Sequence, residues 1–309
     1  MSNQTKRHAP QFGPVHHSLI IVAAASVWGL YWLPLRKVEQ LGLTGAWAVL
    51  AFNLIPLLAL VPLMVWRRER FRQYARLALA IGFFAGAGIA CYALALLYTT
   101  VMRATLLYYL TPVWSTLIAM VVLRERVTWQ RWLAITIGFV GLYMMLSGGD
   151  QTGETFNQGD VLGLMSGIFW GFGATLMRRN PEVSPYDTVS TQYVFGTLIA
   201  FAALLILGTS GAPTPTLNDW LRATPLTFLF CIGIFLPTML AIFWSASKLS
   251  PGRVGILMMS EVVVAGISAS LIAGEHLNNR ELIGAGLILT AGVVEVLGPS
   301  MISKSHDPG

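Results

Sequence analysis

Charged residues are scarce in this chain of 309 residues, because Asp, Glu, Lys and Arg together make up only 11% of it. Soluble domains carry about a quarter charged residues, so the chain lacks the charge that a water-facing surface of this size needs. Hydrophobic residues instead account for 55% of the sequence. This composition excludes an ordinary soluble protein and indicates one whose surface faces lipid.

The motifs of several enzyme classes are also missing. The two cysteines, Cys91 and Cys231, both lie in apolar segments and are expected to act as small buried hydrophobic residues. The five histidines fall in tails, connectors or interfaces, and the sequence has no His-x-x-x-His pair, Gly-x-Ser-x-Gly elbow or Walker-type phosphate loop. We therefore expect neither an enzyme nor an ATP-driven pump, and no metal or other cofactor.

Long apolar runs are what the chain has in abundance. A membrane-spanning helix needs about 20 mostly apolar residues, and ten such runs follow one another with short connectors between them. The polar residues 1–17 precede an apolar run without a small-residue cleavage site, so we expect a retained first helix. The sequence thus predicts an all-α integral membrane protein with helices at 18–36, 44–66, 76–98, 103–123, 131–147, 159–178, 188–208, 225–246, 253–273 and 281–298.

The basic residues are distributed unevenly among the connectors. If the N-terminus is placed in the cytoplasm, 15 of the 20 Lys and Arg residues fall inside and 5 fall outside. Such a bias is typical of membrane topology, so the net charge of +6 indicates no nucleic-acid partner. We expect a multi-pass protein of the bacterial inner (plasma) membrane with both termini in the cytoplasm.

The two halves of the chain resemble each other. Ser26–Gly29 and Ile168–Gly171 share a Trp-Gly pair, and residues 103–146 run parallel to 252–296. Because each half holds five helices, an odd number, the second half must be inserted upside down, and such inverted repeats place a binding site at their interface. The predicted organisation is a cytoplasmic tail 1–17, a five-helix repeat 18–147, an outside linker 148–158, an inverted five-helix repeat 159–298 and a cytoplasmic tail 299–309.

Glycines and prolines mark special positions within the helices. Gly163, Gly167 and Gly171 are spaced four apart, which predicts close approach of two backbones, as a static contact or as a sliding surface. Pro112 and Pro237 each lack a backbone donor and predict helix breaks near mid-membrane.

Two glutamates in the last helices lead to different expectations. Glu261 lies eight residues into the helix 253–273, where an unpaired carboxylate is costly, and no Lys or Arg lies at that depth. A contact with the amine of a substrate, a proton site and a purely structural hydrogen bond all remain open for it. Glu295 lies within three residues of the end of the helix 281–298, so we expect it to reach water.

Three tryptophans lie away from the membrane interfaces, where membrane tryptophans usually gather. Trp28, Trp114 and Trp170 fall near the middles of their helices, and each indole N–H needs an acceptor at that depth. Each alone is better explained by core packing, but three at one depth in two related halves favour the wall of a polar cavity. The predicted substrate-binding set adds residues at similar depth and consists of Glu261, Trp28, Tyr92, Tyr109, Trp114, Trp170 and Met258.

Several short motifs together resemble the EamA domain of the drug/metabolite transporter superfamily. In the first half they are Ala95–Thr100, Leu110–Val113 and Leu123–Glu125, and in the second half Ser250–Val254, Glu261–Val263, Gly274–Glu275 and Ile283–Leu289. Within the superfamily the chain is most similar to YddG-type exporters, which release aromatic and other neutral amino acids from bacteria. The resemblance implies a central cavity lined by the third, fourth, eighth and ninth helices, with the first and sixth completing its wall. Since Glu261 stands opposite Pro112, a substrate contact at that level would be one-sided.

We therefore expect a secondary transporter that exports aromatic and neutral amino acids by alternating access, with a small-molecule substrate and the lipid bilayer as its partners. One alternative is an exporter of hydrophobic cationic drugs or of another metabolite. A membrane enzyme acting on lipid head groups is a second alternative, for which Glu125 and nearby arginines are the only candidates. The exact substrate, coupling to protons, the resting conformation and the oligomeric state, monomer included, stay open.

Overall fold

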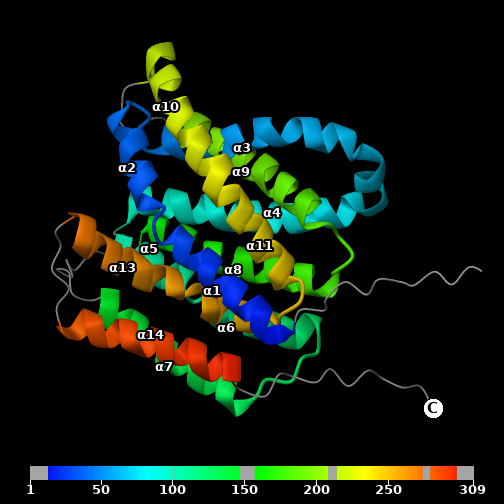
Figure 1. Ribbon diagram of the computed structural model, residues 1–309, viewed down its shortest axis with the longest axis vertical. Helices are drawn as coiled ribbons and strands as arrows, with labels where there is room; N and C mark the ends of the chain where they lie inside the picture. The colour runs from blue at the N-terminus through cyan, green and yellow to red at the C-terminus, as the bar shows by residue number, and fades with distance from the viewer. Residues whose placement is uncertain (1–12, 100, 147–156, 208–213, 274–278, 298–309) are drawn as a thin grey trace, which may run out of the picture.

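The computed structural model describes residues 13–99, 101–146, 157–207, 214–273 and 279–297, and all regular structure within these ranges is helical (Figure 1). The first half contains α1 (Pro14–Trp28), α2 (Trp32–Gln40), α3 (Ala46–Trp66), α4 (Arg68–Tyr98), α5 (Val101–Tyr108), α6 (Thr111–Val122) and α7 (Trp129–Leu146). The second half contains α8 (Gln158–Arg179), α9 (Pro185–Leu207), α10 (Leu217–Phe230), the π-helical turn η1 (Cys231–Phe235), α11 (Leu236–Ala246), α12 (Pro251–Met258), α13 (Ser260–Ala273) and α14 (Asn279–Leu297).

In the described part of the chain, seven helical stretches are long and apolar enough to cross a membrane. They are Pro14–Gln40, Ala46–Trp66, Arg68–Ala95, Gln158–Arg179, Pro185–Ile206, Leu217–Ala246 and Pro251–Ser268, and Thr111–Val122 and Leu282–Leu297 are shorter apolar helices. The expectation of an all-helical membrane protein is thereby confirmed. The predicted count of ten spanning helices stays a prediction.

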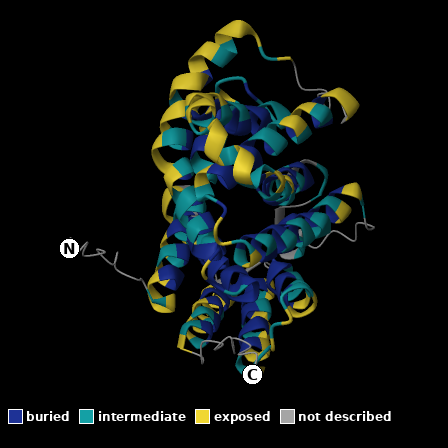
Figure 2. Ribbon diagram, turned by 90° about the vertical axis from the view of Figure 1, so that its right-hand side faces the viewer, coloured by how far each residue is buried: buried dark blue, intermediate teal, exposed yellow. Residues whose placement is uncertain are grey.

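The outer faces of the helices are apolar, as lipid contact requires. Several large apolar side chains are at least 71% exposed on the protein surface, where contact with water would be unfavourable: Leu205, Ile206, Val121 and Leu271. Figure 2 shows exposed residues along the outside of the bundle and buried residues where the helices meet. A bilayer would cover this surface, since the hydrophobic effect favours removing it from water.

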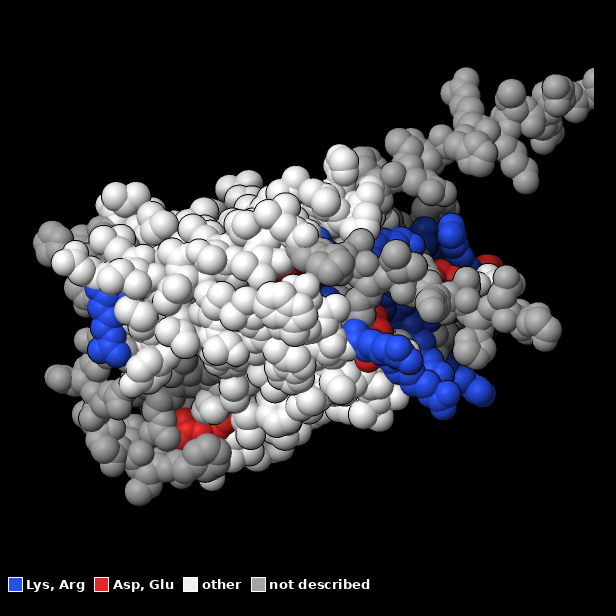
Figure 3. All heavy atoms as spheres, turned by 90° about the horizontal axis from the view of Figure 1, so that it is seen from below, with Lys and Arg blue, Asp and Glu red and all other residues white. Residues whose placement is uncertain are grey.

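Basic side chains gather at one end of the molecule (Figure 3). The turn from α3 to α4 and the connectors 123–128, 180–184 and 247–250 all lie at this end, which is on the right in Figure 1. We call it the basic end. The clustering agrees with the sequence pattern, in which most Arg and Lys residues fall on one side of the membrane.

Glycines allow several helices to touch backbone to backbone. A Cβ atom added at Gly86 on α4 would lie 2.7 Å from the carbonyl oxygen of Gln192 on α9. One added at Gly141 on α7 would lie 2.6 Å from the carbonyl oxygen of Gly284 on α14. Such close contacts give helices the van der Waals packing that holds them together in lipid.

Candidate functional site

Two interrupted helices meet near the middle of the molecule. The first is α5–α6, interrupted at Tyr109 and Leu110, and the second is α12–α13, interrupted at Met259. Leu110 and Met259 each lie seven residues after the start of the parallel stretches 103–146 and 252–296. The two interruptions therefore occupy corresponding positions in the two halves of the chain.

The interrupted helices lie in direct contact. A Cβ atom added at Gly255 on α12 would be 3.0 Å from the Cα of Pro112 on α6, so the two backbones pass each other at this point. Pro112 is the second residue of α6, where a missing N–H disrupts no helical hydrogen bond. The predicted break at this proline thus begins a new helical segment and brings α12 against it.

Interrupted helices leave backbone groups free to bind other partners. The Tyr109 hydroxyl lies 3.5 Å from the carbonyl oxygen of Met258, at the end of α12. It also lies against the carboxylate of Glu261, so it can donate its hydrogen to either oxygen. The first interruption thereby supplies a hydroxyl group to the second.

Three tyrosines surround the partly buried Glu261. Tyr92, Tyr108 and Tyr109 all interact electrostatically with its carboxylate. The Tyr92 and Tyr108 rings lie 4.7 Å apart, the Tyr108 and Tyr109 rings lie 4.9 Å apart, and the Tyr92 hydroxyl is 3.2 Å from the Thr105 hydroxyl. Among the described residues, no Lys or Arg forms an ion pair with Glu261.

The glycines of the two Trp-Gly pairs pack closely against the two interrupted helices. A Cβ atom added at Gly29, which caps α1, would lie 2.5 Å from the Glu261 carbonyl oxygen. One added at Gly171 on α8 would lie 3.2 Å from the backbone nitrogen of Ser115 on α6. The glycine of each half thus packs on the interrupted helix of the other half, close to the break.

Five of the seven predicted binding residues share one apolar cluster. Tyr109, Trp170 and Met258 are buried in it, and Trp28 and Tyr92 pack against it. Glu261 lies next to the cluster through its contact with Tyr109. Trp114 is not among the described members of this cluster, and its place in the binding set stays a prediction.

The tryptophans differ in how their N–H groups are satisfied. The Trp28 N–H donates to the Thr238 hydroxyl at 3.1 Å. Those of Trp114 and Trp170 are buried without a hydrogen-bond acceptor among the described residues. The ring of Trp170 packs edge-on against Phe243, with 5.9 Å between the ring centres.

Tyr108 and Thr238 belong to the site but were not predicted. Neighbouring residues of a continuous helix point about 100° apart, so Tyr108 is not expected beside Tyr109 around one carboxylate. The interruption at Tyr109 changes the local geometry and brings both rings to Glu261. The consecutive tyrosines, three and four residues before Pro112, were the available signal.

A second polar cluster lies at the basic end. Arg131 on α7 donates to Glu295 on α14 at 2.8 and 3.2 Å and to Ser250 at 2.7 Å. Arg253 on α12 donates to Ser18 on α1 at 3.0 Å. The expectation that Glu295 reaches water is wrong, since it is 6% exposed and its charge is paired with Arg131 instead.

Chemically, the central site offers one carboxylate, several phenols and apolar walls. A carboxylate with aromatic neighbours can attract a cationic group, and the rings can pack against an apolar or aromatic solute. Within the described ranges, no group of three or more His, Cys, Asp and Glu side chains lies close enough to hold a metal ion.

Comparison with known proteins places this geometry in a family. A family model described as "EamA-like transporter family" matches residues 17–147 and 157–296. An uncharacterised transporter of Archaeoglobus fulgidus is 28% identical over 71% of this chain and 75% of its own length. A riboflavin transporter of Vibrio cholerae is 26% identical, covering 68% of this chain and 67% of its own. An S-adenosylmethionine uptake transporter of Rickettsia bellii is 24% identical, with 62% of each chain covered.

The fold is also found among solved structures. One crystal structure superposes with a TM-score of 0.70 and covers 90% of this chain and 96% of that one, at 18% sequence identity. This likeness supports the arrangement of the helices and carries no information about substrate.

Proposed function

Because the chain belongs to the EamA-like transporter family and is a membrane transporter, we propose that it exports aromatic and other neutral amino acids. The proposed setting is the bacterial inner membrane, with both termini in the cytoplasm. The solute would bind at the crossing of the interrupted helices, and the two halves would open in turn to either side of the membrane. Membership in a transporter family argues against the alternative of an enzyme that acts on lipid head groups.

The proposal includes ten spanning helices in two inverted repeats. Counting α1–α2, α5–α6, α10–α11 and α12–α13 each as one interrupted span, together with the six remaining helices, yields ten. The corresponding interruptions at Leu110 and Met259 support the repeat. So does the packing of Gly29 on α13 and of Gly171 on α6, because these are matching pairs of helices in the two halves.

The proposal rests on the carboxylate of Glu261. Its carboxylate is partly buried, has no described cationic partner and faces the hydroxyl of Tyr109. A charge in such a place is costly unless something neutralises it. The ammonium group of an amino acid would do so, while its aromatic side chain packs against Tyr92, Tyr108 and Trp170.

The basic end supports alternating access. Arg131 in the first half pairs with Glu295 and Ser250 in the second, and Arg253 in the second half pairs with Ser18 in the first. These contacts tie the halves together at the end proposed to be cytoplasmic. Opening toward the cytoplasm would require them to separate, so we propose that they form part of the closed gate on that side.

A second candidate substrate is a cationic aromatic metabolite. The relatives named for riboflavin and for S-adenosylmethionine both carry, by name, solutes with planar aromatic rings, and the second of these is a cation. A carboxylate among aromatic rings suits such a solute as well as it suits an amino acid. This candidate predicts that transport does not require a carboxylate group on the solute.

The test is transport by the purified protein in proteoliposomes. Release of labelled Trp, Phe and Met is measured against empty liposomes, and unlabelled amino acids are added as competitors. Saturable release of these three substrates supports the exporter. A protein that releases none of them but moves labelled riboflavin or S-adenosylmethionine is the transporter of the second candidate.

The same vesicles separate the role of charge from that of shape. Tryptamine keeps the ammonium group and the ring of Trp but lacks the carboxylate. Competition by tryptamine as strong as that by Trp would favour the second candidate, whereas competition by Trp alone supports amino-acid export.

A further inference from the structure

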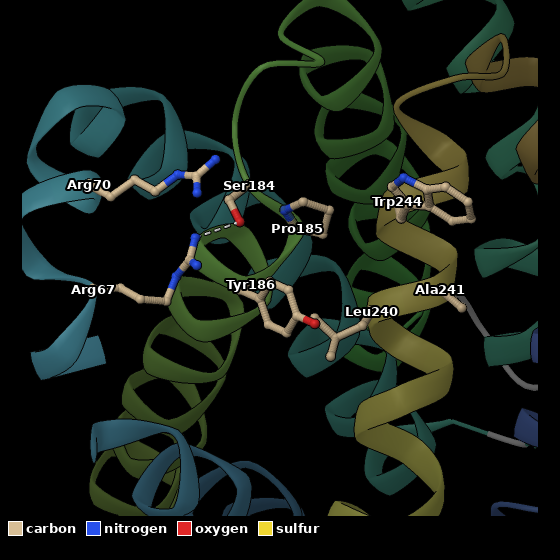
Figure 4. Close-up of a pocket in the computed structure, with 8 residues that line it drawn as sticks. All are labelled: Arg67, Arg70, Ser184, Pro185, Tyr186, Leu240, Ala241 and Trp244. Atoms are coloured by element: carbon tan, nitrogen blue, oxygen red, sulfur yellow. Dashed lines mark hydrogen bonds between the residues drawn. The ribbon is translucent and has the colours of Figure 1, made fainter. Parts of the chain in front are cut away.

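A pocket with a volume of about 460 Å³ lies at the basic end, and none of its lining residues belongs to α5–α6 or α12–α13. Figure 4 shows its three sides. Arg67 and Arg70 extend from the α3–α4 turn, Ser184, Pro185 and Tyr186 form the start of α9, and Leu240, Ala241 and Trp244 lie on α11. The pocket is therefore basic on one side and apolar on the other.

The two arginines differ in the partners they have. Arg67 donates to the Ser184 hydroxyl at 3.0 Å and to Asp187 at 3.4 Å, and its guanidinium lies 5.4 Å from the centre of the Tyr186 ring. Arg70 is exposed and forms no hydrogen bond or ion pair with any described residue. One cation of the pocket is therefore neutralised within the fold, and the other is available to an anionic ligand.

Neighbouring acids do not cancel the charge of Arg70. Glu69 is 3.4 Å from Arg68 and 3.8 Å from Arg72, so its carboxylate already faces two other guanidinium groups. The beginning of α9 adds to the positive potential, because backbone N–H groups at a helix N-terminus carry partial positive charge. Asp187 in the first turn of α9 pairs with Arg67, so Arg70 is the cation that an anion at this pocket would meet.

The apolar side continues along α11 away from the basic end. Pro237, Leu240 and Trp244 are spaced three and four residues apart and so share one face of the helix. Pro237 is exposed, and Ile234, one turn further, is 39% exposed. An apolar track thus begins at the pocket and runs toward the middle of the membrane.

We propose that this pocket binds an acidic phospholipid of the leaflet at the basic end, with its phosphate at Arg70 and one acyl chain along α11. Tyr186 and Trp244 have the amphipathic rings typical of the membrane interface, at which a head group lies. Basic pockets between helices on the cytoplasmic side are suited to anionic head groups. This site is separate from the central one and does not depend on which solute is transported.

The test is lipid binding to the purified full chain by native mass spectrometry. Affinity for the first bound lipid is compared between dioleoyl phosphatidylglycerol and dioleoyl phosphatidylcholine. We expect tighter binding of the acidic lipid. In Arg70→Ala this affinity falls about fivefold, the ratio expected for one basic residue near an anionic surface.

Arg72→Ala is the matched control. Arg72 lies on the same helix, is also exposed and is paired with Glu69 outside the pocket, so its removal should leave lipid affinity unchanged. Arg70→Lys keeps the charge and shows that loss of binding in Arg70→Ala does not come from misfolding.

Three results would overturn the proposal. Equal affinity for the two lipids would remove the preference for an acidic head group. An equal loss in Arg70→Ala and Arg72→Ala would mean that diffuse surface charge attracts the lipid. Displacement of the bound lipid by millimolar inorganic phosphate would identify a site for a soluble anion instead.

Discussion

Two glutamates of the second half have opposite surroundings. Glu295 on α14 is buried and accepts two hydrogen bonds from the Arg131 guanidinium. Glu261 on α13 is partly exposed, lies among tyrosines and has no described cation beside it. The charge of Glu295 is therefore satisfied within the fold, and that of Glu261 is left for something that the fold does not contain.

This difference indicates separate roles. A buried charge that keeps its partner holds two helices in one geometry, whereas removal of one partner leaves the other uncompensated. A carboxylate without a partner is instead stabilised by water, a proton or a bound cation. We infer that changes at Glu295 act on the stability of the conformation closed at the basic end and that changes at Glu261 act on binding of the solute.

The largest expected effect is that of Glu261→Gln. Glutamine keeps the shape of the side chain and can still accept a hydrogen bond from Tyr109, but it has no charge to attract a substrate ammonium group. Transport of labelled Trp should fall to the rate of empty liposomes, while the apparent Tm of the purified protein stays near that of the parent.

Glu261→Asp is the control for this prediction, because it keeps the charge and should retain part of the activity. Full transport by Glu261→Gln would remove Glu261 from the mechanism and leave it a structural role. Loss of the folded peak of Glu261→Gln in size-exclusion chromatography would likewise indicate that Glu261 has a structural role.

The next largest effect is expected from Arg131→Met. This change removes the guanidinium that donates both hydrogen bonds to Glu295, and breaking a buried pair of this kind costs roughly 3–5 kcal/mol of stability. The two side chains are 7% and 6% exposed, so water compensates little of the loss. Unfolding in increasing SDS should occur at a much lower detergent fraction than for the parent protein.

Combining Arg131→Met with Glu295→Leu distinguishes a paired charge from simple packing. Removing both charges should restore most of the stability, since no uncompensated carboxylate remains. A double variant as unstable as the sum of both single variants would contradict the assignment.

Long apolar helices were the feature easiest to predict from sequence. The run 44–66 corresponds to α3 (Ala46–Trp66), and the run 159–178 corresponds to α8 (Gln158–Arg179). Such helices follow from the bilayer thickness, because a spanning segment needs a minimum apolar length wherever its neighbours lie. Hydropathy alone therefore finds them.

The interruptions and the partners across helices were harder to predict. Pro112 predicts the break in α5–α6. No proline or glycine lies at Met259, although α12–α13 is interrupted there as well. The partner of Glu295 is 164 residues away in sequence, and hydropathy carries no information on which helices pack together. Tertiary packing decides both features, so neither hydropathy nor a local motif reveals them.

A smaller effect is expected where α1 meets α13. The Cβ of Gly29→Ala would lie 2.5 Å from the Glu261 carbonyl oxygen, so one helix must shift. Overpacking of this kind typically costs about 1–3 kcal/mol, and the shift should also displace Glu261. We expect both a lower apparent Tm and slower transport.

Gly286→Ala serves as the matched control on α14. No atom lies within 4 Å of a Cβ added at that glycine, so the change should leave transport and apparent Tm unchanged or slightly improved. If both alanine variants behave alike, the close approach at Gly29 does not matter for function.

The tyrosine hydroxyl groups around Glu261 are expected to contribute unequally to solute binding. Tyr109→Phe removes the hydroxyl that faces Glu261 and the Met258 carbonyl, and the loss of one hydrogen bond should raise the half-saturating substrate concentration about fivefold. Tyr108→Phe keeps the ring that packs on Tyr92, so its effect should be smaller. Equal kinetics for Tyr109→Phe and the parent protein would exclude a role for this hydroxyl.

The smallest effect concerns a third glutamate, Glu125, in the connector between α6 and α7. Burial raises the pKa of its carboxyl group, and the attraction of Arg131 and Arg178 only partly opposes this. One carboxyl oxygen is also buried without a hydrogen-bond partner among the described residues. Unlike Glu295, this carboxylate is not fully satisfied when ionised.

The sign of the pH effect follows from that raised pKa. The folded protein binds the proton of Glu125 more tightly than the unfolded chain does, so its stabilising contribution is complete below the unfolded pKa, about 4.3. The contribution is lost as the pH rises through the higher folded pKa. Glu125→Gln should therefore raise the apparent Tm slightly at pH 7 and reduce its dependence on pH, whereas Glu69→Gln, at an exposed ion pair, should change neither. A lower apparent Tm of Glu125→Gln at pH 7 would mean that the two arginines stabilise the ionised carboxylate more than burial destabilises it, and Glu125 would then resemble Glu295 rather than Glu261.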